Sequence, residues 1–130
     1  MSRLAYVDAS ALAKLILEEP ASAAMARWHL ESERIVTSRV GLVETRRAVA
    51  RHAHDAVHLE FVLRSVETIE LDGVIARAAG AIGPATLRTL DAIHVASAVA
   101  LQPELDAFVT YDDRLAEAAR AAGLTVIRPA

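Results

Sequence analysis

Four carboxylates, in four separated segments of the chain, lie where they could gather at one site. Asp8 occurs in YVDAS, Glu44 in RVGLVETRR, Asp91 in LRTLDAIHVASA and Asp112 in FVTYDDRL. Sites built only from carboxylate oxygens suit the hard cations Mg²⁺ and Mn²⁺. The four acids therefore predict a divalent-metal site, provided that the fold brings them together.

Asp91 stands near the head of a segment, residues 87–101, that is otherwise apolar on every side. A helix that is apolar all round is normally buried, and an ionised carboxylate is costly to bury without a partner. A favourable charge in a first helical turn, with Thr89 as the cap, would explain an acid here. It would not explain why the helix is apolar all round, so we favour a functional role for Asp91.

The other three acids each have a structural alternative. Asp8 could cap the first helix, although Ser10 is an equal candidate. Glu44 could pair with Arg47, three residues further along a solvated helix face, and Asp112 could cap the last helix. Taken singly, these structural roles are favoured. Four independent caps and pairs would not all need to lie on one edge of a sheet, so the joint pattern favours a shared site.

Short apolar runs alternate along the chain with segments that favour helix. We expect strands at 4–7, 35–38, 68–71, 107–111 and 125–127, and helices at 10–17, 21–30 (with Pro20 in its first turn), 41–51, 56–65, 74–81, from 89 onward, and 114–122. This alternation predicts one α/β domain over residues 1–130, with a mostly parallel sheet covered on both faces. The sites of such folds lie beyond the carboxyl ends of the strands, where Asp8 and Asp112 are expected.

Composition narrows the class of protein. Of 130 residues, 54% are apolar, but no run approaches the roughly 18 residues of a membrane span, so we expect no membrane contact. The apolar run near the start leaves no room for a signal peptide, and the absence of cysteine suits a reducing cytosol; we expect a cytoplasmic protein. A net charge of −3 argues against a simple basic sheath for nucleic acid. Lys14 is the only lysine, which excludes a receiver domain with its late lysine.

The histidines and the one tryptophan have ordinary explanations. His52, His54 and His58 are close in sequence, but without a third ligand in register they are expected to be surface residues. His94, one turn from Asp91, could orient that acid, although a satisfied core histidine is favoured. Trp28 could anchor a partner segment, but packing of its helix on the core is favoured.

The segments VDASALAKL, VGLVETRRA, LRTLDAIHVASA and FVTYDDRLAEAARAAGL resemble the four acidic motifs of the PIN domain, especially those of VapC-type toxins from bacterial toxin–antitoxin pairs. Their order and spacing match over nearly the whole chain. The resemblance implies a PIN-like three-layer α/β/α sandwich around a central, mostly parallel sheet of about five strands. It also implies that the metal-site acids are Asp8, Glu44, Asp91 and Asp112, supported by the hydroxyls of Ser10 and Thr110.

For activity, the resemblance implies an Mg²⁺- or Mn²⁺-dependent endoribonuclease that cleaves single-stranded or structured RNA through metal-activated water. Asp8 would take the central metal position and Asp91 and Asp112 the flanking ones, while Glu44 would act through water. The implied partners are a VapB-like antitoxin, whose tail covers the acids, and a second copy of the chain in a homodimer.

Basic side chains near the acids could hold the substrate. The candidates for RNA contact are Arg46, Arg47, Arg51 and Arg88. A solvated charged face is an equal explanation for any one of them. Two alternatives also stay open at this point: a PIN-like module that binds RNA or a partner without catalysis, and a nuclease of the same fold directed at DNA.

Overall fold

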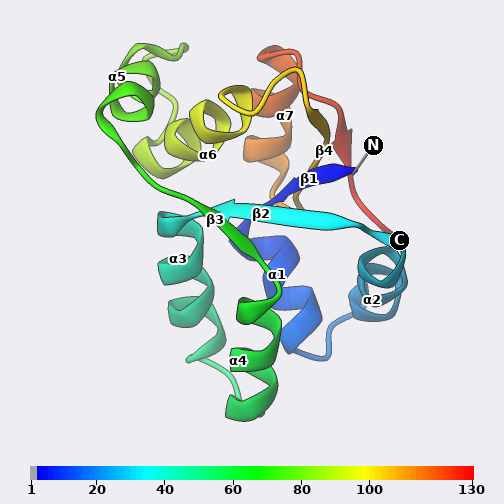
Figure 1. Ribbon diagram of the computed structural model, residues 1–130. Helices are drawn as coiled ribbons and strands as arrows, with labels where there is room; N and C mark the ends of the chain where they lie inside the picture. Colours follow the sequence, from blue (N-terminus) through cyan, green and yellow to red (C-terminus); the bar gives the residue numbers. More distant parts are fainter. Residues whose placement is uncertain (1–2) are drawn as a thin grey trace.

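The structure, a computed structural model, describes residues 3–130 and contains one five-stranded sheet with helices on both faces (Figure 1). The strands are β1 (Leu4–Val7), β2 (Arg34–Ser38), β3 (Glu67–Ile69), β4 (Leu105–Val109) and β5 (Val126–Ile127). The helices are α1 (Ala9–Ile16), α2 (Ser22–Glu31), α3 (Arg39–Val49), α4 (Ala56–Arg64), α5 (Gly73–Ala81), α6 (Thr89–Val99) and α7 (Asp113–Ala121). All the strand pairs are parallel.

The helices form two layers, which confirms the expected three-layer α/β/α sandwich. In Figure 1, α1 to α4 lie below the sheet, and α5 to α7 lie above it. Most helix contacts follow the same division, since α1 packs against α2, α3 and α4, and α6 packs against α5 and α7; in addition, α3 and α6 contact each other. The predicted α/β class and the number of strands are therefore confirmed.

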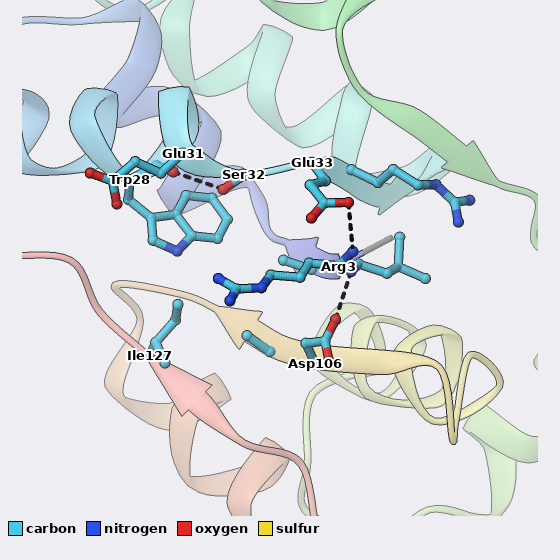
Figure 2. A pocket seen from close by; sticks show the side chains of 11 residues that line it. Arg3, Trp28, Glu31, Ser32, Glu33, Asp106 and Ile127 are labelled. Atoms are coloured by element: carbon cyan, nitrogen blue, oxygen red, sulfur yellow. Dashed lines mark hydrogen bonds between the residues drawn. The ribbon is translucent and has the colours of Figure 1, made fainter. Parts of the chain in front are cut away.

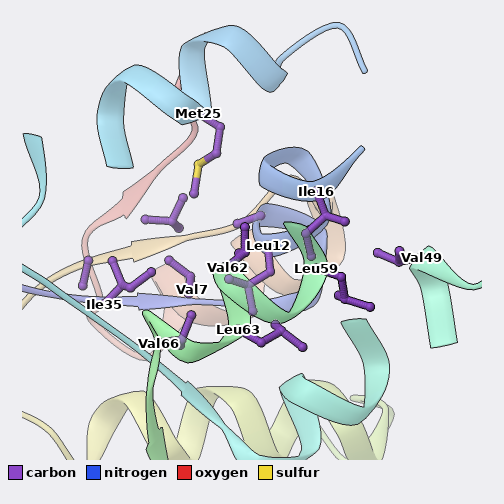
Figure 3. Close-up of a cluster of buried hydrophobic side chains, with 13 residues drawn as sticks. Val7, Leu12, Ile16, Met25, Ile35, Val49, Leu59, Val62, Leu63 and Val66 are labelled. Carbon is purple, nitrogen blue, oxygen red and sulfur yellow. The ribbon is translucent and has the colours of Figure 1, made fainter. Parts of the chain in front are cut away.

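Strand β1 is apolar along its whole length because it contributes side chains to two cores. Ala5 and Val7 of β1 join the cluster formed with α1 to α4, in which Leu12 and Met25 are fully buried (Figure 3). Leu4 and Tyr6 point to the opposite face and join the second cluster with α6 and α7. Successive side chains on a strand point to opposite faces, so a strand covered on both sides reads as a continuous apolar run.

The strand order, β3-β2-β1-β4-β5, locates the site of the fold. From β1 the chain moves outward through β2 to β3, and it then returns to the other side of β1 to form β4 and β5. Such a reversal of strand order opens a crevice at the carboxyl ends of the two strands that flank it. Here those strands are β1 and β4, which are followed by Asp8 and by Thr110 to Asp112.

Helix α6 is buried on all sides over eight consecutive residues, from Asp91 to Ala98. It contacts α5, α7, α3 and strand β2. This position explains why its sequence is apolar all round, as expected for a buried helix. It also means that Asp91 needs a partner close at hand.

Some predicted details were wrong. Strand β4 ends at Val109, two residues before the expected end, so Thr110 lies in the turn that follows. Pro20 precedes α2, which begins at Ser22, instead of lying in its first turn. Thr89 does not cap α6; Arg88 holds the cap position, without a side-chain hydrogen bond to the helix. None of the helices within residues 3–130 has the length and apolar character needed to cross a bilayer.

Candidate functional site

Asp8 is a buried carboxylate at the carboxyl end of β1, with 4% of its surface exposed. Its Oδ1 atom accepts hydrogen bonds from the Ser10 hydroxyl at 2.7 Å and from the Ala11 backbone N–H at 3.0 Å, the second of which caps α1. Burial raises the pKa of Asp8 above its ordinary value, against the lowering effect of these bonds. Asp8 therefore caps α1, and it also lies at the carboxyl edge of the sheet, where the site is expected.

Two hydroxyls join the end of β1 to the end of β4. Thr110 Oγ1 donates to Asp8 Oδ2 at 2.8 Å and accepts from the Asp112 backbone N–H at 3.0 Å. Ser10 Oγ accepts from the Tyr111 backbone N–H at 2.8 Å. Asp112 Oδ1 in turn accepts from the Leu115 N–H at 3.1 Å and caps α7. The first and fourth acids are thus held in register through Thr110.

The partner of Asp91 is an arginine one turn earlier. Arg88 Nε donates to Asp91 Oδ2 at 3.0 Å, and Arg88 Nη2 lies 3.5 Å from Asp112 Oδ2. The hydrogen bond to Asp91 is the main cause that raises the pKa of Arg88, and the charges of Asp112 and Glu44 add to it. One guanidinium therefore compensates the charge of Asp91, which is only 7% exposed, and reaches a second acid.

Glu44 is half-buried and turns toward α6. Its Oε1 atom accepts a hydrogen bond from His94 Nε2 at 2.5 Å, so the expected alternative, a local pair with Arg47, is not what holds it. His94 is fully buried, as favoured from the sequence, but its partner is Glu44 and not Asp91.

The structure therefore brings all four predicted acids to the carboxyl edge of the sheet. Thr110 links Asp8 to Asp112, and Arg88 links Asp112 to Asp91. Glu44 of α3 bonds to His94, which lies on α6 three residues after Asp91. The donors are all carboxylate oxygens, the set that Mg²⁺ and Mn²⁺ prefer.

Within residues 3–130 no three or more carboxylates or histidines are arranged, as they stand, so that they could hold a metal ion. The reason lies in the contacts: the Arg88 guanidinium lies between Asp91 and Asp112, and Asp8 directs both oxygens at hydroxyls. The Arg88 side chain is 54% exposed, so it is free to swing away. A cation could then take up the charge that Arg88 now compensates.

Of the four arginines predicted to contact RNA, the structure places Arg88 among the acids. Arg46 instead pairs with Glu60 of α4, at 2.6 Å from Nη1 to Oε1. Arg47 and Arg51 are exposed. The cluster of His52, His54 and His58 is exposed as expected, and His58 Nε2 bonds to the carbonyl of Leu15 at 2.8 Å.

A pocket of about 290 Å³ lies at the opposite edge of the sheet, where the strands begin (Figure 2). Trp28, Arg3 and Glu33 line it, together with Asp106, whose Oδ2 accepts from the Leu4 N–H at 2.8 Å. Trp28 also packs on the core of α1 to α4, as favoured from the sequence. This pocket is separated from the acids by the length of the strands.

Comparisons with known proteins agree with the fold and the motifs. The model of the PIN domain family matches residues 5–121. Among characterised proteins, the chain is similar to Ribonuclease VapC47 of Mycobacterium tuberculosis, at 38% identity over 95% of this chain and 96% of that protein. It is also similar to Ribonuclease VapC46 of the same species, at 36% identity over 95% and 96%.

Two solved structures share the fold. VapC20 of M. tuberculosis, described as a sarcin-ricin loop cleaving toxin, has a TM-score of 0.71 at 18% identity, over 96% of this chain and 99% of that one. VapBC2 from Rickettsia felis, bound to a DNA fragment from its promoter, has a TM-score of 0.70 at 14% identity, over 98% and 99%.

Proposed function

The chain belongs to the PIN domain family, and we propose that it is a VapC-type endoribonuclease, the toxin of a toxin–antitoxin pair. The proposal is supported by the contacts near the point where the strand order reverses, which join Asp8 to Asp112 through Thr110 and Asp112 to Asp91 through Arg88, and bond Glu44 to His94. Relatives that share more than a third of their residues with this chain are named ribonucleases.

We propose further that cleavage depends on Mg²⁺ or Mn²⁺. Asp8, Asp91 and Asp112 would hold the ion, and Glu44 would contact it through water. Such an ion, when bound, lowers the pKa of water and neutralises charge on the phosphate. The carboxylates themselves do not attack; they fix positions. Arg88, displaced from Asp91 and Asp112, would be free to contact a phosphate of the substrate.

We propose single-stranded or structured RNA as the substrate. The test is cleavage of a labelled RNA strand, an RNA hairpin and a DNA strand of the same sequence, each with Mg²⁺, Mn²⁺ or EDTA. The proposal expects RNA products with 5′-phosphate ends, formed with either ion and not in EDTA. Cleavage of DNA alone would identify a DNA-directed nuclease, and binding of RNA without products would identify a non-catalytic module; either result rejects the proposal.

We propose a VapB-like antitoxin as the partner, supported by the similarity of the fold to the VapC component of a VapBC complex. Expression of the chain alone should slow bacterial growth, and coexpression of the neighbouring small gene should restore it. Normal growth in the presence of abundant folded protein would contradict a toxin. A homodimer stays a prediction, which sedimentation of the purified chain tests.

A further inference from the structure

His94 is a buried histidine with a polar partner at each ring nitrogen. It lies on α6 with 2% of its surface exposed. Its Nδ1 atom is 2.6 Å from Tyr6 Oη, and its Nε2 atom is 2.5 Å from Glu44 Oε1. Any buried histidine needs partners for its ring nitrogens, and here one of the two partners is a predicted site acid.

The direction of each hydrogen bond follows from two groups at the ends, one of which can only donate and the other only accept. The Ser38 backbone N–H can only donate, and it donates to Tyr6 Oη at 3.2 Å. An ionised carboxylate can only accept, so His94 Nε2 carries the proton that bonds to Glu44. Burial raises the pKa of Tyr6 far above its ordinary value, which keeps its hydroxyl protonated. The Tyr6 proton is then assigned to His94 Nδ1, and every donor in the chain of bonds has an acceptor.

Aromatic packing holds the Tyr6 end of this chain of bonds rigid. The Tyr6 ring stacks on Phe108 with centroids 5.1 Å apart and planes 9° apart. The His94 ring meets Tyr6 edge-on, at 5.7 Å and 77°. The rings of Tyr6 and Phe108 are both fully buried. The imidazole therefore has a fixed orientation before Glu44 binds to it.

A glycine brings the Glu44 end within reach. A Cβ atom on Gly41 would lie 2.3 Å from Thr37 Oγ1 and 3.3 Å from His94 Cε1. Helix α3 can lie this close to Thr37 of β2, and also to His94 of α6, because residue 41 has no side chain. Glu44 follows three residues later on the same helix, where its carboxylate meets His94 Nε2.

We propose that His94 is a positioning residue, which holds the Glu44 carboxylate at the site through its Nε2–H. The inference rests on the proposed function, in which Glu44 would be one of the acids of the metal site. The Glu44 side chain is 28% exposed and has several rotatable bonds, so without the histidine it would sample other rotamers. Loss of an outer contact of this kind lowers activity by about 10–100-fold in metal enzymes.

Two substitutions separate the two ring nitrogens. In His94→Asn the amide occupies roughly the place of Nδ1 and cannot reach Glu44, whereas in His94→Gln an N–H donor extends to roughly the place of Nε2. We expect kcat to fall by about 10–100-fold in His94→Asn, with KM for RNA unchanged, and to be largely restored in His94→Gln. Val95→Ala, a buried neighbour on α6, is the control: it should lower the melting temperature and leave kcat unchanged at temperatures where it is folded.

A double-mutant cycle asks whether His94 acts through Glu44. In a Glu44→Ala background, His94→Asn should cause no further loss, because the residue to be positioned is gone. If the loss of kcat in the double variant equalled the product of the two single losses, the inference would be overturned. A His94→Asn enzyme with wild-type kcat would overturn it as well. Failure of the wild type to cleave RNA at all would instead reject the proposed function.

A measurement on the folded protein needs no variant of His94. In ¹⁵N NMR of the imidazole, Nε2 should carry a slowly exchanging proton in the wild type, and that proton should exchange faster and shift in Glu44→Ala. An Nε2 without a proton, or a proton indifferent to Glu44→Ala, would overturn the positioning role even if His94→Asn and His94→Gln failed to fold.

Discussion

The hydroxyl of Thr110 lies 2.8 Å from Asp8 Oδ2, although the two residues are 102 positions apart in the chain. Thr110 Oγ1 also accepts a hydrogen bond from the Asp112 backbone N–H at 3.0 Å. One side chain therefore fixes the first acid relative to the fourth, across the boundary between β1 and β4. The spacing of these two acids depends on this hydroxyl as well as on the strand pairing.

Replacing Thr110 with valine should damage both stability and activity. The shape is kept, but Asp8 loses a donor and the Asp112 N–H loses its acceptor in a buried place, which costs about 1–3 kcal/mol. Cleavage should fall by about 10–100-fold, as for other contacts that support metal ligands. Denaturant unfolding and RNA cleavage measure the two effects. Ser97→Ala, a buried hydroxyl on α6, is the control, and unchanged cleavage by Thr110→Val would contradict the linkage.

Asp8→Asn should make the metal-free protein more stable at neutral pH. Burial raises the folded pKa of Asp8 above the ordinary value of 3.8, so between these two values the native state binds more protons than the unfolded state. Wild-type stability therefore falls as pH rises through this window, and the variant, which cannot ionise, avoids that loss. Asparagine also caps a helix as well as aspartate does.

The measurement for Asp8→Asn is the free energy of unfolding in EDTA from acid to neutral pH. The advantage of the variant should grow with pH above about 3.8 and then level off, while its RNA cleavage is lost. A variant that is less stable than the wild type at neutral pH would show that the Asp8 charge is favourable in the fold.

Arg88→Gln should strengthen metal binding and weaken RNA binding. The guanidinium compensates Asp91 and Asp112, so its removal leaves a more negative site for Mg²⁺, and it also removes a proposed phosphate contact. The rise in melting temperature with Mg²⁺ should become larger, and KM for RNA should increase severalfold. Arg34→Gln, which breaks an exposed pair with Glu67 at the far edge, should change neither. Weaker Mg²⁺ binding in Arg88→Gln would contradict the competition.

Gly41→Ala should destabilise the protein and impair cleavage together. The new Cβ would lie 2.3 Å from Thr37 Oγ1 of β2 and 3.3 Å from His94 Cε1 of α6. The overpacking should cost about 1–3 kcal/mol and displace α3, and Glu44 with it, from both neighbours. A Cβ atom added at Gly80 in α5 would have no atom within 4 Å. Gly80→Ala should therefore stabilise the helix by about 0.5–1 kcal/mol and leave cleavage normal. Thermal melting and cleavage rates check both, and a harmless Gly41→Ala would refute the close approach.

The fold class, with its mostly parallel sheet of about five strands, and the edge on which Asp8 and Asp112 lie could be predicted from the sequence. Strand β1 matches the predicted range of 4–7 because a strand buried on both faces is a continuous apolar run. The rule that sites lie at carboxyl ends of parallel strands then placed Asp8 and Asp112 correctly. The resemblance to VapC-type motifs added Glu44, whose helix alone suggested a solvated face.

The partners of the acids could not be predicted, because they depend on side-chain directions and on contacts between distant elements. Glu44 bonds to His94, 50 residues away, where local spacing suggested Arg47. His94 is one turn from Asp91, yet its ring turns toward α3. Arg46, a predicted RNA contact, forms an ion pair with Glu60 of α4. No pattern in the local sequence distinguishes these outcomes.

The most direct test of the account is the effect of Mg²⁺ on the wild type and on Asp91→Asn. Asparagine keeps the shape of Asp91 and removes one charge from the group of acids, and it also removes the need to compensate a buried charge with Arg88. Melting temperatures in EDTA and in Mg²⁺ are measured beside RNA cleavage. Because a ligand stabilises only the protein that binds it, Mg²⁺ should raise the melting temperature of the wild type more than that of the variant. The variant should not cleave RNA, and in EDTA it should melt at or above the wild-type temperature. If Asp91→Asn cleaves RNA well but melts far lower without metal, Asp91 is a structural residue of α6 and the proposed metal site is wrong.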